Sequence, residues 1–131
     1  MQENHLFEYA IIRVVPKAER EEFLNAGVIL YCRDLQFLET MISLNKERLL
    51  GFSASIDIIQ LQEYLDAFEK IARGDAAGGA IGKLDPASRF RWLTATRSTV
   101  LQTSKVHPGL CTDPHETLSR LHRQMVLCQE N

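Results

Sequence analysis

Alternating and clustered hydrophobic positions predict three strands in the first third of the chain. Residues 7–15 (FEYAIIRVV) are rich in aromatic and β-branched side chains and end at Pro16, which cannot continue a central sheet ladder. Two similar runs, NAGVILYCR at 25–33 and FLETMISL at 37–44, follow after short connections. Short connections join antiparallel neighbours, because a parallel crossover needs about a dozen residues or more. We therefore expect a hairpin or meander, with Gly27 at a bulge or a close backbone approach.

Two later segments carry the spacing of amphipathic helices. Between residues 55 and 73 the apolar positions recur three and four residues apart, at Ile58, Leu61, Leu65, Phe68 and Ala72. Asp57 can cap this helix and Gly74 can end it. The start signal Asp113-Pro114-His115-Glu116 precedes a second apolar stripe, formed by Leu118, Leu121, Met125 and Val126.

The segments between these helices have weaker patterns. Charged residues 17–23 predict a short helix or turn on the surface, and residues 74–86, rich in glycine and alanine, predict a loop. The Gly82-Lys83 pair does not make a phosphate-binding P-loop, since Ala77 and Leu84 occupy two of the required positions. RFRWL at 89–93 predicts a half-buried strand with Phe90 and Trp92 inward and Arg89 and Arg91 outward, and STVLQTS at 98–104 predicts another strand.

This order of elements predicts an α+β fold in a single domain, residues 1–131. We expect a largely antiparallel sheet of four to five strands, covered by two main helices on one face. An exposed apolar stripe on the C-terminal helix would indicate a homodimer.

Composition supports a folded cytoplasmic domain without a membrane segment. Hydrophobic residues make up 45% of the chain and charged residues 24%, the usual balance of globular proteins. The N-terminus lacks a secretory signal, and no apolar stretch is long enough to span a membrane. Three cysteines without CxxC spacing, Cys32, Cys111 and Cys128, favour reduced thiols, although a pair among them could bridge. The net charge of -2 argues against a uniformly basic nucleic-acid binder.

Positive charge is nevertheless concentrated between Arg89 and His107, a stretch without a carboxylate. Arginine can bind phosphate bidentately, and hydroxyl groups can complete an anion site. The candidate ligand-binding residues are Arg13, Arg33, Arg89, Arg91, Arg97, Ser98, Ser104 and His107. The competing interpretation is a solvated strand face whose arginines pair with nearby carboxylates, which contributes about 0–1 kcal/mol for each pair.

Two alternatives involve cysteine and histidine. His107, Cys111 and His115 are spaced four apart, but the prolines nearby prevent one continuous helix and no fourth ligand follows, so no metal is expected. A nucleophilic pair of Cys32 or Cys111 with His107 would need an activated thiolate, and Cys32 lies in an apolar run typical of a core. We expect no cofactor.

Two further alternatives rest on carboxylates and aromatic rings. Glu19 and Glu22, together with Asp34, could bind Mg²⁺, although acidic helix faces are usually only solvated. Exposed aromatic side chains beside arginines could stack on nucleic-acid bases, although such residues are more often part of a core. The candidates for stacking are Tyr31, Phe90 and Trp92.

Two segments together resemble a known family. They are YAIIRVVPKAEREEFLNAGVILYC at 9–32 and RFRWLTATRSTVLQTSKVHPGL at 89–110, and they resemble the bacterial family known only as domain of unknown function 3037. The resemblance covers nearly the whole chain but brings no established activity, substrate or catalytic residues. Members are associated with genes for kinases that resemble bacterial persistence toxins, so the resemblance implies a partner protein, such as a toxin-like kinase, or a regulatory accessory role.

These observations favour a non-catalytic binding or regulatory and accessory module. It would bind a protein partner or a phosphate-bearing ligand through the basic face around Arg89–His107. The alternative is a small phosphoryl-transfer or nucleic-acid-processing enzyme that uses Arg97, Ser98 and His107 with a nearby carboxylate. A concave pocket that gathers these side chains would favour the enzyme, and a flat basic face would favour the binding module.

Overall fold

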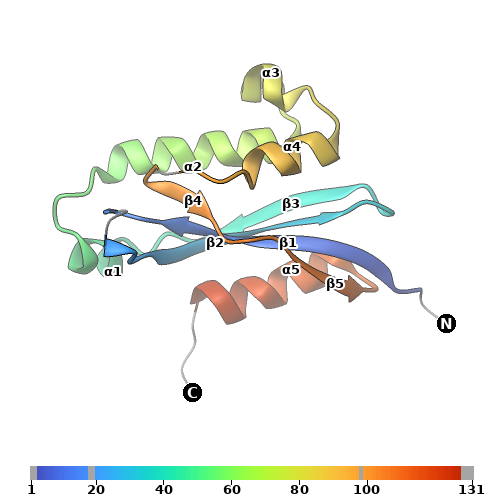
Figure 1. Cartoon of the computed structure of the whole chain (residues 1–131), viewed down its shortest axis with the longest axis horizontal. Coiled ribbons are helices and arrows are strands. Elements are labelled where there is room, and N and C mark those ends of the chain that lie inside the picture. Colours follow the sequence, from blue (N-terminus) through green and yellow to red (C-terminus); the bar gives the residue numbers. More distant parts are fainter. Residues whose placement is uncertain (1–2, 18–19, 98, 128–131) are drawn as a thin grey trace.

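The computed structural model describes residues 3–17, 20–97 and 99–127, and it confirms the α+β class (Figure 1). The strands are β1 (His5–Val14), β2 (Leu24–Cys32), β3 (Phe37–Ile42), β4 (Leu101–Thr103) and β5 (His107–Cys111). The α-helices are α1 (Lys46–Phe52), α2 (Ile58–Arg73), α3 (Gly79–Gly82), α4 (Pro86–Leu93) and α5 (Pro114–His122). The 3-10 helix η2 (Ala76–Gly78) and the π-helix η3 (Arg123–Leu127) complete the described elements.

The five strands form one antiparallel sheet in the order β3-β2-β1-β4, and β5 also pairs with β1. Strand β4 pairs with the last residues of β1, while β5 pairs with its first residues. These two short strands therefore follow one another along the same edge of β1. The predicted antiparallel β2–β3 connection is confirmed.

Gly27 occupies a crowded position in β2, as the sequence predicts. The pairing register of β1 with β2 shifts between Ile12 and Arg13, beside Gly27. A Cβ atom at residue 27 would lie 2.8 Å from the carbonyl oxygen of Met41 and 2.8 Å from a side-chain carbon of Ile42. The close approach of β3 requires glycine here.

Helices cover both faces of the sheet, so the prediction of two helices on one face is wrong. Helices α2 and α4 lie on one face and α5 on the other (Figure 1). Along β1, Ala10 and Ile12 belong to the core under α2, whereas Phe7 and Ile11 belong to the core under α5. Strand β2 is buried along nearly its whole length, and a strand that is apolar on both faces needs cover on both.

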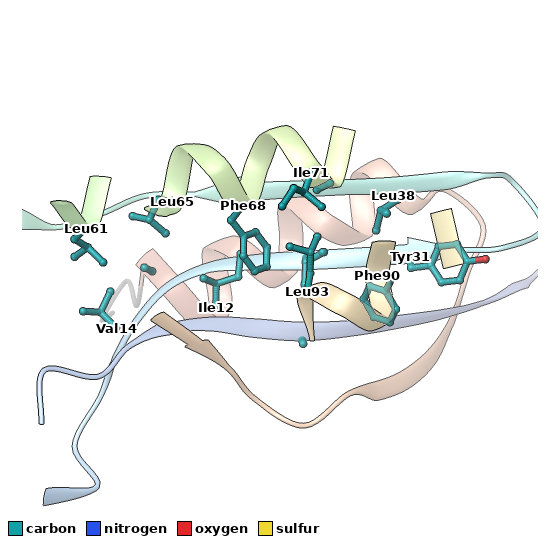
Figure 2. Packing of buried hydrophobic residues seen from close by; sticks show 14 of the residues in the cluster. Ile12, Val14, Tyr31, Leu38, Leu61, Leu65, Phe68, Ile71, Phe90 and Leu93 are labelled. Carbon is teal, nitrogen blue, oxygen red and sulfur yellow. The ribbon is translucent and has the colours of Figure 1, made fainter. Parts of the chain in front are cut away.

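Helix α2 has the predicted stripe and the predicted ends. The Asp57 carboxylate accepts a hydrogen bond from the backbone N–H of Gln60 at 3.0 Å, and Gly74 ends the helix with a left-handed φ of 71°. Figure 2 shows Leu61, Leu65, Phe68 and Ile71 pointing from this helix toward the sheet, where they belong to the same core as Phe90 and Leu93 of α4.

Helix α5 also begins as predicted, with the Asp113 carboxylate accepting from the backbone N–H groups of His115 and Glu116. Its stripe residues Leu118 and Leu121, with Val126 of η3, are buried against the sheet. The exposed stripe that would indicate a homodimer is therefore not formed by the described part of this helix.

Residues 86–93 form helix α4, so the prediction of a strand over RFRWL is wrong. Asp85 accepts a hydrogen bond from the backbone N–H of Ser88, and Pro86 begins the helix. This is the same start signal that identifies α5. Phe90 points inward as predicted, but Trp92 is exposed rather than buried, because residues two apart on a helix do not share a face.

Other differences are local. Residues 74–86 contain η2 and α3 rather than only a loop, and helix α1 and strand β5 are additional elements. The predicted strand at 98–104 is confirmed only as the shorter β4, and Ser98 lies outside the described residues. The predicted helix or turn at 17–23 also falls partly outside them: Glu19 is not described, and Arg20 and Glu21 form a turn.

Candidate functional site

An apolar groove, here called the Trp92 groove, opens between α2, α4 and the start of β4. Its volume is about 280 Å³, and it is lined by Tyr64, Ala67, Phe68, Ile71, Trp92, Leu93, Arg97, Thr99 and Leu101. Phe68, Ile71 and Leu93 are buried core residues that form its floor. Trp92 is 42% exposed and Tyr64 43% exposed, so two large aromatic side chains stand at its sides. This is a concave, mostly apolar surface with aromatic walls, which is typical of a binding site.

Arg97 adds one positive charge to this groove. Its guanidinium lies 4.4 Å from the centre of the Trp92 ring and donates hydrogen bonds to the carbonyl oxygens of Leu93, at 3.0 Å, and Trp92. These carbonyls are at the C-terminal end of α4, where a cation is stabilised by the helix dipole. The guanidinium is thus held in place and keeps further N–H donors for a ligand.

A second and larger depression, here called the arginine hollow, lies between the sheet and the start of α4. Its volume is about 660 Å³, and it is lined by Leu6, Glu8, Tyr31, Arg33, Asp34, Gln36, Asp85, Pro86, Ala87 and Arg91. Glu8 of β1 is paired with Tyr31 of β2, so their side chains lie next to each other on the face of the sheet that lines the hollow. Arg33 comes from the turn after β2 and Arg91 from α4, so the fold brings together two candidate residues far apart in the sequence.

The acidic groups of the arginine hollow are partly engaged. Asp34 lies 3.6 Å from the Nδ1 atom of His5, and Asp85 accepts hydrogen bonds from the backbone N–H and the hydroxyl of Ser88. The Ser88 hydrogen bonds, the side-chain one foremost, lower the pKa of Asp85. The guanidinium groups of Arg33 and Arg91 form no ion pair or hydrogen bond with another described residue.

Arg89 and Arg13 lie in neither depression and contact the protein itself. The guanidinium of Arg89 donates to the carbonyl oxygens of Leu84, at 2.6 Å, and Ala72, at 3.5 Å, beside Gly74 at the end of α2. The guanidinium of Arg13 lies 4.0 Å from the centre of the Phe23 ring. In these contacts Arg89 holds α4 against the end of α2.

Ser104 joins the strands where β4 gives way to β5. Its hydroxyl accepts a hydrogen bond from the backbone N–H of Ile11 and donates to the carbonyl oxygen of Lys105, both at 2.8 Å, and its own N–H donates to the Ile11 carbonyl. This buried hydroxyl replaces a missing ladder partner.

His107 and Arg97 lie on opposite faces of the sheet. The His107 ring is exposed and lies 5.4 Å from the ring of Tyr9, which packs on the core under α5. Arg97 belongs to the groove on the α2 side. The cluster that the enzyme alternative requires is therefore not assembled from these two side chains, and Ser98 lies outside the described residues.

The cysteine and metal alternatives gain no supporting geometry. Cys32 and Cys111 are buried free thiols in the core under α5. Desolvation by burial, followed by the neighbouring Cys32, raises the pKa of the Cys111 thiol, which disfavours the thiolate. Among residues 3–17, 20–97 and 99–127, no three His, Cys, Asp or Glu side chains are gathered so as to hold a metal ion.

Sequence reasoning missed Tyr64 and the exposure of Trp92. The signal for Tyr64 is a second row on α2, in which Tyr64, Ala67 and Ile71 follow at spacings of three and four beside the main stripe. The signal for Trp92 is the helix start at Asp85-Pro86, which puts Phe90 and Leu93 on the buried side and turns residue 92 away from it.

A family model described as "Protein of unknown function (DUF3037)" matches residues 9–126. No curated protein and no solved structure matches the chain. None of the helices in the described part of the chain has the length and apolar character needed to cross a membrane.

Proposed function

This chain belongs to the DUF3037 family of proteins of unknown function, and we propose that it is a non-catalytic binding module with a regulatory or accessory role. In this proposal the Trp92 groove is the docking site for a partner protein. The partner presents an apolar side chain next to an Asp or Glu residue. We place the module in the cytoplasm, a reducing compartment in which buried free thiols such as Cys32 and Cys111 are usual.

The pairing of Trp92 with Arg97 at an open apolar groove carries this proposal. Tryptophan, tyrosine and arginine are the residues that most often dominate the binding energy of protein interfaces, and this groove contains one of each. The walls are already in place, since Arg97 is fixed by two backbone carbonyls and by the indole ring. A preformed site loses less conformational entropy when it binds.

The charge of the groove specifies the partner segment. The apolar floor of Phe68 and Leu93 accepts an aliphatic or aromatic side chain, and Arg97 is the only charged residue among the described residues that line the groove. A carboxylate beside the inserted side chain can accept from Arg97 in a partly desolvated setting, where such hydrogen bonds contribute about 1.5–3 kcal/mol.

Selection from a library of random peptides tests this assignment. We expect enriched peptides to share an apolar residue adjacent to Asp or Glu, and to shift the emission of Trp92, the single tryptophan of the chain. Trp92→Ala should weaken their binding at least about 30-fold, the loss typical of an interface hot spot. Arg97→Ala should weaken it less and remove the preference for an acidic residue.

Phe23→Ala is the matched control. Phe23 is 44% exposed and is stacked by Arg13 as Trp92 is stacked by Arg97, but it lies outside the groove. Peptides that bind Trp92→Ala as tightly as wild type, or no enrichment at all, would contradict the proposal. A homodimer lost in Trp92→Ala would assign the groove to a second copy of the chain and also overturn the proposed partner.

A further inference from the structure

We infer that the arginine hollow is a second, separate site, which binds a phosphate monoester. The inference is independent of the Trp92 groove, because it rests on residues that line a different depression. Arg33 and Arg91 approach this hollow from two elements, the turn after β2 and helix α4.

The hydrogen-bonding groups of the hollow are unevenly satisfied, and this asymmetry points to a ligand that carries acceptor oxygens. Two of its carboxylates have partners within the protein: Asp34 lies beside His5, and Asp85 is bound to Ser88. The two guanidinium groups have none among the described residues. An oxyanion could accept hydrogen bonds from Arg33 and Arg91 together and so provide the acceptors that these two guanidinium groups lack within the described part of the protein.

A phosphate monoester fits better than a carboxylate or a nucleic acid. It carries a charge of about −1.5 to −2 at pH 7 and three acceptor oxygens, enough to engage two guanidinium groups at once. A nucleic-acid backbone would extend its charge past the carboxylates of Glu8, Asp34 and Asp85, which line the same hollow and repel it.

The size of the hollow indicates that the phosphate is attached to an organic group. Its volume of about 660 Å³ greatly exceeds that of an inorganic phosphate ion. Leu6, Tyr31 and Pro86 provide apolar and aromatic surface beside the arginines. The Glu8 carboxylate, which has no hydrogen bond or ion pair with a described residue, can accept a hydrogen bond from a hydroxyl or ammonium group of that organic part.

Calorimetric titration with inorganic phosphate, O-phospho-L-serine and a phosphoserine-containing peptide tests the inference. We expect O-phospho-L-serine to bind more tightly than inorganic phosphate. Binding by the peptide alone would place the same monoester on a polypeptide, and binding by the free amino acid would identify a small-molecule site. Arg33→Gln and Arg91→Gln should each weaken binding at least about tenfold, the loss expected for a charged hydrogen bond.

Arg48→Gln is the matched control, since Arg48 is an exposed arginine on α1 outside the hollow. The affinity of Arg48→Gln for each phosphate probe should equal that of wild type. The inference is overturned if none of the three phosphate probes binds, if Arg48→Gln weakens binding as much as Arg33→Gln, or if an oligonucleotide binds in preference to the monoesters.

Discussion

The Trp92 groove and the arginine hollow are both lined by residues of the same short helix, α4, and differ in almost every property. The groove is small and apolar, has a single guanidinium fixed by the protein, and lies on core residues of α2 and α4. The hollow is more than twice as large, mixes charges of both signs, and has two guanidinium groups without partners among the described residues.

The difference follows from adjacent positions on one helix. Successive residues of an α-helix point about 100° apart, so Arg91 and Trp92 enter different surroundings although they are neighbours in the sequence. Phe90 and Leu93 of the same helix are buried and attach it to the sheet. This helix of eight residues thus buries Phe90 and Leu93 and presents Arg91 and Trp92 to separate depressions.

Removing the shared anchor should have the largest effect and should damage both regions. Leu93 is 1% exposed, so Leu93→Ala leaves a cavity and is expected to lower the free energy of unfolding by about 2–5 kcal/mol. Urea denaturation measures this loss. Trp92→Ala, next to it but exposed, should cost far less stability; equal losses in the two variants would mean that Trp92 belongs to the core.

Measuring both ligands on a variant of each region should show that the two regions bind independently. Trp92→Ala should weaken binding of groove-selected peptides at least about 30-fold and leave O-phospho-L-serine affinity within about twofold of wild type, because the two sites share no lining residue. Arg33→Gln should do the reverse. Calorimetry with both ligands on both variants provides the measurement. Weaker binding of both ligands by either variant would show that the groove and the hollow form one continuous site instead of two.

Loss of the helix cap should loosen both regions with little change elsewhere. Asp85→Ala removes the acceptor for the Ser88 N–H, so amide hydrogen exchange should accelerate in residues 86–93. The effect should be smaller than that of Leu93→Ala. Uniform acceleration over the whole chain would contradict a local role of the cap.

Acidic pH should weaken the N-terminal cap of α4 in the wild-type protein, as Asp85→Ala does. The hydrogen bonds from Ser88 lower the pKa of Asp85 below its ordinary value of 3.8, so the folded state holds this proton more weakly than the unfolded state. The stabilisation is therefore fully present above pH 3.8 and is lost as pH falls below it. Relative to the intrinsic exchange rate at each pH, the protection of the α4 amides should fall over this range in wild type and remain unchanged in Asp85→Asn.

The elements with strong end signals were predictable from the sequence, and those that depend on tertiary pairing were not. Asp57 and Gly74 mark the two ends of α2, and Asp113-Pro114 marks the start of α5. By contrast, β5 contains proline and glycine, and only its pairing with β1 makes it a strand. Helix α4 carries a readable start signal, but the alternation of Arg89 to Leu93 is also typical of a strand.

The candidate site was predictable only as a set of residue types. The charge pattern identified Arg33, Arg91 and Arg97, which do line the two depressions, yet it could not distinguish them from Arg89, which is bound to backbone carbonyls. That distinction depends on which carbonyls lie nearby once α2 and α4 have packed. Convergence of side chains from separate elements leaves no periodic signal in a single sequence.

Site-specific photo-crosslinking in the native host tests the docking role of the Trp92 groove most directly. A photoreactive amino acid is placed at residue 64, in the groove, or at residue 59, which is on the same helix and 77% exposed but outside the groove. We expect one defined covalent product from position 64, absent from position 59 and lost when Trp92→Ala is added. The same product from both positions, or none from position 64, would contradict the account.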